Sequence, residues 1–170
     1  MTGTAEPGTV DRLRAWAHGS LPPSAAIELL VRAFDGRFAR ADQPWIRVEP
    51  NGATWLDDKF LAASLGGLSG GERRVLTVVA ALADSTDARR VDLADIVTGL
   101  DRANLDLILA ALAHAGGSHE HTSLEFADGN GSARFVRLPS LHSWPDEASR
   151  ANSARMLPTG GRSTAAEPHR

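Results

Sequence analysis

The sequence predicts a mainly helical α+β fold. Apolar residues recur at helical spacing in several segments, the clearest of which begin near residues 22, 69 and 101. Two β-rich segment pairs flank the turn sequences Pro50-Asn51-Gly52 and Asp128-Gly129-Asn130-Gly131, which is typical of short hairpins. The 170 residues, of which 42% are hydrophobic, are enough for one domain with its own core.

The first half of the predicted fold, residues 9–67, combines helices with a hairpin. A short helix is expected over 10–18, and Pro22 and Pro23 lie where a second helix would begin, a position at which a missing N–H is harmless. The expected apolar face of this second helix consists of Ile27, Leu30, Val31 and Phe34, followed by Gly36. Residues 45–57 then predict the first hairpin, after which Asp57 caps a short helix.

The second half, residues 68–145, is predicted to contain three helices and a second hairpin packed on the first half. Ser69 and Glu72 have the spacing of a capping box at the start of a helix that runs to about residue 83. Residues 90–93 fit either a short strand or a brief helix capped by Asp92. Asp101 caps the third helix, whose expected core face is Leu105, Ile108, Leu109 and Leu112 and whose expected outer stripe is Arg102, Asp106, Ala110 and Ala113.

The order of these elements resembles the winged-helix variant of the helix-turn-helix domain. This resemblance covers about 70 residues, 69–138, and rests on the order helix, helix, helix, hairpin. It implies that the third helix could enter the major groove of DNA while the hairpin contacts the phosphate backbone. Winged helices also serve as protein-interaction modules, so the resemblance leaves the partner open.

The charges of this segment argue against strong DNA binding. The whole chain has 18 basic and 21 acidic residues, and residues 69–138 hold seven arginines and ten carboxylates. A DNA-binding face normally concentrates positive charge. The candidate DNA or partner contacts are Arg89, Arg90, Arg102, Asn104, Arg134 and Arg137. The alternative interpretation is that these are solvated side chains that pair with nearby carboxylates.

One segment is similar to a nucleotide-binding signature. Leu68 to Arg74, LSGGERR, resembles the LSGGQ-type motif of ABC ATPases and their SMC relatives, and Thr98 to Asp101 resembles the D-loop of that family. The resemblance implies contact with a nucleotide held by a partner ATPase. The chain has no glycine-rich loop with a lysine of the Walker A type, because its only lysine is Lys59. A capping box explains Ser69 to Glu72 without a nucleotide.

Few other residues in the sequence indicate a metal site or a catalytic function. The absence of cysteine excludes disulfides, thiolate metal sites and thiol nucleophiles. His114, His119 and His121 lie close together, and on a strand His119 and His121 would share one face, so a metal site is an open alternative to a polar loop. No catalytic motif is present, and we expect neither enzymatic activity nor a cofactor.

The sequence also predicts the state of the two chain ends and the compartment of the protein. Residues 1–8 and 146–170 are small, polar and rich in Pro, Ser and Gly, so we expect both to be disordered. No apolar stretch fits a secretory signal or a membrane span, which predicts a cytoplasmic protein with no membrane contact.

The sequence as a whole favours a non-enzymatic interaction module that binds a protein partner, a second copy of the chain included, as a regulatory or accessory factor. A DNA-binding regulator with the same winged helix is the first alternative. An accessory subunit of an ABC- or SMC-type ATPase is the second.

Overall fold

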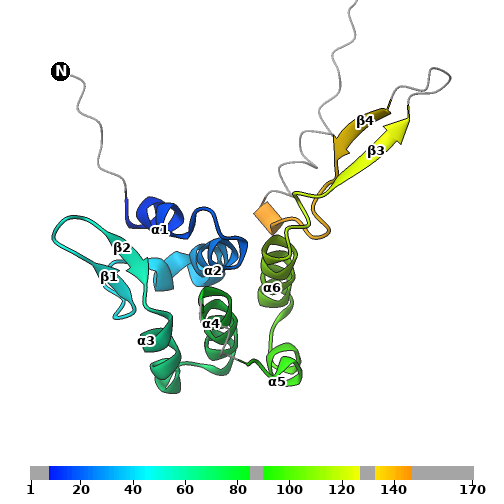
Figure 1. Cartoon of the computed structure of the whole chain (residues 1–170). Helices are drawn as coiled ribbons and strands as arrows, with labels where there is room; N and C mark the ends of the chain where they lie inside the picture. The colour runs from blue at the N-terminus through cyan, green and yellow to red at the C-terminus, as the bar shows by residue number, and fades with distance from the viewer. Residues whose placement is uncertain (1–7, 85–89, 127–132, 147–170) are drawn as a thin grey trace, which may run out of the picture.

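A computed structural model of the chain describes residues 8–84, 90–126 and 133–146. It is mixed α+β and mostly helical, with two small antiparallel sheets, as the sequence predicts. The elements in chain order (Figure 1) are α1 (Thr9–Ala17), α2 (Leu21–Arg32), the 3-10 segment η1 (Ala33–Ala39), β1 (Ile46–Val48), β2 (Thr54–Leu56), α3 (Asp58–Ala63), η2 (Leu65–Gly67), α4 (Gly70–Ala83), α5 (Leu93–Thr98), α6 (Arg102–Ala115), β3 (Thr122–Phe126) and β4 (Ala133–Arg137).

Helix α2 is the centre of the molecule. It packs against α1, α4 and α6, and Figure 1 shows it above α4, with α6 beside both. Five of its side chains are fully buried, namely Ala25, Ala26, Ile27, Leu29 and Leu30. The buried surface of α2 is therefore wider than the single apolar face that the sequence predicts. Neighbouring elements on several sides also bury Leu29 and the two alanines.

The end of α2 differs from the sequence prediction. The helix stops at Arg32, so Phe34 does not continue its apolar face. Phe34, Asp35 and Gly36 instead form a left-handed turn with φ angles of 52°, 55° and 71°. This turn redirects the chain so that Trp45, which is 4% exposed, donates from Nε1 to the carbonyl of Phe38 at 2.9 Å.

The first hairpin and its cap form as predicted. Strands β1 and β2 pair in register, with Arg47 opposite Trp55, and Gly52 in the turn has a φ of 84°. A carboxylate oxygen of Asp57 accepts from the backbone N–H of Phe60 at 2.9 Å, which caps α3. These are local interactions, which a short stretch of sequence is able to specify.

The caps of α4, α5 and α6 are also those predicted. Ser69 and Glu72 form a reciprocal capping box on α4. Asp92 caps α5, so the alternative of a strand over 90–93 is wrong. Asp101 accepts from the backbone N–H of Asn104 at 2.8 Å and from its side chain at 2.7 Å. These bonds lower the pKa of the Asp101 carboxyl because they stabilise its charged form.

None of the helices in the described residues is long and apolar enough to cross a membrane.

Candidate functional site

On helix α6, two adjacent alanines face the protein interior and two leucines face outward. Ala110 and Ala111 are 1% and 0% exposed, whereas Leu109 and Leu112 are 44% and 45% exposed. The sequence prediction is right for Ile108, which is 4% exposed, and wrong for Leu109 and Leu112, which it placed in the core, and for Ala110, which it placed outside. The physical reason is α2, which packs along α6, since small side chains let two helices approach closely.

The outward leucines border an apolar groove between α4, α5 and α6. The groove has a volume of about 130 Å³, and every residue that lines it is apolar. Its exposed rim continues onto α5, where Leu93 and Val97 are 66% and 48% exposed. We call the surface formed by Leu93, Val97, Leu105, Leu109 and Leu112 the leucine face.

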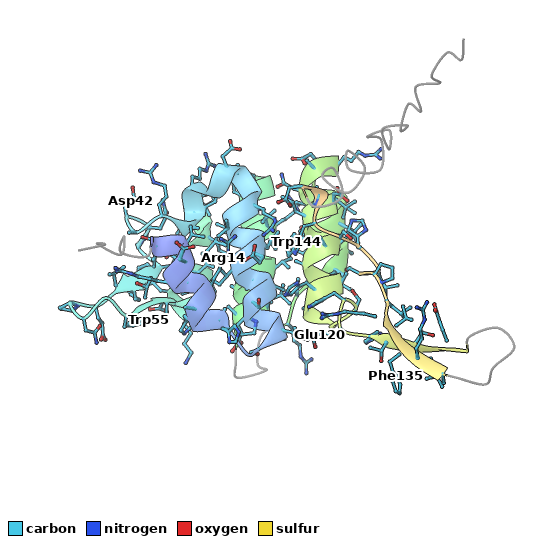
Figure 2. The ribbon with its side chains drawn as sticks, turned by 90° about the horizontal axis from the view of Figure 1, so that it is seen from above. Arg14, Asp42, Trp55, Glu120, Phe135 and Trp144 are labelled. Atoms are coloured by element: carbon cyan, nitrogen blue, oxygen red, sulfur yellow. The ribbon has the colours of Figure 1, made fainter. Side chains whose placement is uncertain are left out.

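The second hairpin is the other exposed apolar surface. Figure 1 shows β3 and β4 extending away from the helices, and Figure 2 places Phe135 far out on this hairpin. Leu124 and Phe135 are opposite each other in the strand register and are 45% and 79% exposed. Within the described residues this sheet has only two strands, so both of its outer edges are unpaired.

The candidate contacts on the hairpin do not form one basic face. Arg134 is paired with Glu125 at 2.8 Å, and Arg137 donates to the backbone carbonyl of His119 at 2.7 Å. Arg137 follows Arg134 by three positions, an odd offset, so the pleat of β4 directs the two side chains to opposite faces. The turn of this hairpin and the candidate contact Arg89 lie outside the described residues.

The candidate contacts near α5 and α6 are similarly dispersed. Arg90 is exposed in the segment before α5, and Arg102 is exposed in the first turn of α6. The side chain of Asn104 is held by the Asp101 cap. Asp106, which the sequence placed on the outer stripe, is bonded to Nε2 of His142 at 2.7 Å.

A polar cavity of about 380 Å³ lies among α1, α2, α6 and the strap, which we define as residues 139–146. Glu28 accepts two bonds from Arg14, the shorter 2.6 Å, and a further one from Arg32. Arg32 also donates to Asp146 at 3.2 Å. Since each of these charges is paired, the cluster acts as an ion-pair network that joins helices and strap.

The strap enters this cavity through one aromatic side chain. Trp144 is 5% exposed, and Figure 2 shows it between α2 and α6. The guanidinium carbon of Arg32 lies 4.5 Å from its ring centre, and the ring of His114 lies 6.1 Å away. The strap is thereby fixed to two helices from different halves of the sequence.

The histidines are stacked rather than arranged around a common point. The rings of His114 and His119 lie face to face, 4.5 Å apart, and His119 is in a turn, as in the polar-loop alternative, and not on the strand that the metal alternative requires. Burial lowers the pKa of His114, and repulsion from His119 and Arg32 adds to this shift. No group of three potential metal-ligating side chains occurs in the described residues.

The LSGGE-like segment has a structural partner within the chain. Arg74 of α4 donates to the backbone carbonyl of Asp95 at 2.6 Å and to its carboxylate at 3.1 Å. Its guanidinium fills the space next to Gly99, where a Cβ would lie only 2.2 Å away. The two segments that resemble the ATPase signature are therefore adjacent, and Arg74 joins them.

Sequence reasoning missed the two most distinctive surfaces of the molecule. Three residues of the leucine face, Leu105, Leu109 and Leu112, were predicted to lie in the core, and the polar cavity combines residues from α1, α2, α6 and the strap that no local pattern connects. The signal for the first was present, because α6 has an alanine face as well as a leucine face.

Comparison of the chain with protein-family models, curated proteins and solved structures finds no match.

Proposed function

We propose that this chain is a non-enzymatic interaction module of winged-helix-like type, which binds a protein partner on the leucine face as a regulatory or accessory factor. One observation carries the proposal: α6 buries Ala110 and Ala111 and leaves Leu109 and Leu112 almost half exposed. A helix that served only the core of a monomer would gain more by burying its larger apolar side chains.

The groove beside these leucines supports a binding role. Exposed apolar side chains that surround a concave apolar surface are typical of sites that receive a partner's side chains. Covering the remaining exposed area of one leucine contributes about 1 kcal/mol, on the scale of 25 cal/mol per Å². The five residues of the leucine face therefore offer enough area for a hot spot of binding.

The winged-helix-like interpretation is supported by the order α4, α5, α6, β3, β4. In winged-helix domains the third helix of this order is the one that reads DNA, and α6 is the third helix here. Its outward stripe here carries leucines, where a reader of base edges needs polar side chains. The chemistry of the stripe therefore favours a protein over DNA as the partner.

A pair of matched variants tests the proposal. We expect Leu109→Asp, on the leucine face, to abolish partner binding, whereas Val48→Asp, at a similarly exposed apolar residue of β1, leaves it intact. The measurement is quantitative recovery of bound proteins on the wild type and both variants from cells that express the chain. A partner retained equally by all three proteins would contradict the proposal.

The DNA alternative has its own measurement. Fluorescence anisotropy with random duplex DNA at low salt should show no binding at micromolar protein. Binding that is weakened by Arg102→Ala and by Arg134→Ala would replace the proposal with a DNA-binding function.

A further inference from the structure

We propose that the leucine face binds a second copy of this chain, and that each copy lays its β3–β4 hairpin on the leucine face of the other, with Phe135 inserted into the groove. This inference rests on the proposed function and names the partner. In such a dimer the β3–β4 hairpin of each copy is the exchanged segment, and the groove of the other copy is its binding site.

The hairpin lacks a supporting layer within its own chain. A two-stranded sheet on its own is at best marginally stable in water and needs a further strand or a packed face. Here the face that carries Leu124 and Phe135 is solvent-exposed, and Phe135 is the most exposed aromatic side chain in the described residues, at 79%. A second apolar surface placed against this face would complete the sheet.

The groove matches an aromatic side chain in size and chemistry. An apolar protein cavity of about 150 Å³ holds a benzene molecule, so a groove of about 130 Å³ suits the ring of one phenylalanine. No polar side chain lines the groove, so nothing there requires a hydrogen bond from the group that enters.

The hairpin does not reach the groove of its own chain in this structure. Figure 1 shows the hairpin leaving one end of α6 and pointing away from the helices, whereas α5 lies by the other end of α6. The hairpin of a second copy is not attached to this α6, so it can approach the groove from outside.

Reciprocal exchange gives a closed, symmetric dimer. In a two-fold arrangement each hairpin-to-groove contact occurs twice, so the buried area doubles and both exposed apolar surfaces are covered together. A face-to-face contact between two leucine faces would leave Leu124 and Phe135 uncovered. Exchange is therefore the arrangement that accounts for both surfaces.

The charges around the two surfaces are compatible with this contact. The hairpin carries Glu125 and Arg134, with side chains 52% and 73% exposed. Arg102 and Asp106 lie at the rim of the leucine face, beside Leu105 and Leu109. Each surface thus carries charges of both signs, and a two-fold contact can bring opposite charges together.

The absence of cysteine allows a direct test by cross-linking. A disulfide forms only where the two Cα atoms come within about 7 Å. Mixing the single variants Phe135→Cys and Leu109→Cys under oxidation should give the mixed disulfide dimer as the main product, identified by mass. Phe135→Cys mixed with Val48→Cys should give little of it. A dominant Leu109→Cys homodimer would overturn the exchange.

Analytical ultracentrifugation supplies the second test. We expect the full chain to be a dimer at micromolar concentration, and Phe135→Ser to weaken self-association roughly 30-fold or more, as for a hot-spot residue. The melting temperature of Phe135→Ser, measured at concentrations where both proteins are monomeric, should match that of the wild type, because the side chain is exposed in one copy.

The two proposals fail in different ways. A wild-type chain that stays monomeric at 100 μM overturns the exchange. In that case, loss of a different protein partner in Leu109→Asp would still support the proposed function. If Leu109→Asp changes neither self-association nor any other binding, both proposals are overturned.

Discussion

Single side chains determine where the helices of this protein begin. Ser69, Asp57, Asp92 and Asp101 each accept hydrogen bonds from backbone N–H groups of the first turn that follows them. A cap of this kind contributes about 1 kcal/mol and involves residues within three positions of each other. All four caps were predictable from the sequence for that reason.

The stability of the protein should depend on pH through one histidine, His114. Its folded-state pKa lies below the value near 6.5 expected for an unfolded chain, so the unfolded state takes up the proton first as the pH falls. The free energy of unfolding should therefore decrease as the pH is lowered through about 6.5 toward the folded-state pKa, and not above that range. Urea denaturation at a series of pH values measures this change.

The matched variants for this prediction are His114→Gln and His121→Gln. The first should flatten the pH dependence just below about 6.5, because it removes the histidine whose pKa is lowered on folding, whereas the Asp101 carboxyl contributes only at lower pH. The second replaces an exposed histidine and should retain the wild-type slope. Equal slopes in both variants would refute this role for His114.

At the scale of elements, α6 shows why an amphipathic pattern does not fix a helix's orientation. Leu109 and Leu112 lie on one side of the helix and Ala110 and Ala111 on another, and all four are apolar. The leucine pattern is the stronger signal in the sequence, yet α2 packs against the alanines. Which side of α6 is buried depends on how closely a neighbouring helix approaches, and the sequence of α6 alone does not specify that distance.

Two substitutions on α6 report this orientation. Ala111→Leu should destabilise the protein by about 1 to 3 kcal/mol, because Ala111 is fully buried and extra methyl groups in a packed core force its neighbours to move. Leu112→Ala should cost only about 1 kcal/mol, since nearly half of this leucine is exposed. Urea denaturation at low protein concentration, where association does not contribute, gives both values. The reverse order of costs would restore the orientation expected from the sequence.

At the scale of the whole molecule, the two halves of the sequence are joined through α2 and the strap. Helix α2 comes from the first half and packs against α4 and α6 of the second. The strap returns to it through Trp144, which contacts Arg32 of α2 and His114 of α6. A bond of 2.7 Å between His142 and Asp106 adds a second attachment.

Removal of the strap's anchor tests this connection. Trp144→Ala should lower the free energy of unfolding by about 3 to 5 kcal/mol, the range typical of a buried aromatic residue. Trp16→Ala on α1 is the control, because 40% of that side chain is exposed, and its cost should be clearly smaller. Denaturant titration of both variants decides the comparison. A Trp144→Ala variant as stable as Trp16→Ala would mean that the strap does not hold the halves together.

The sequence by itself determined the helix caps, the two hairpins and the order of elements, because each depends on residues close together in the chain. It also determined the lack of cysteine chemistry and the shortage of positive charge in residues 69–138. The tertiary structure decided which side of α6 is buried, that α2 is enclosed on several sides, and that Arg14, Arg32, His114 and Trp144 surround one cavity. These features depend on contacts between segments as much as 114 residues apart, and such contacts follow from packing rather than from local pattern.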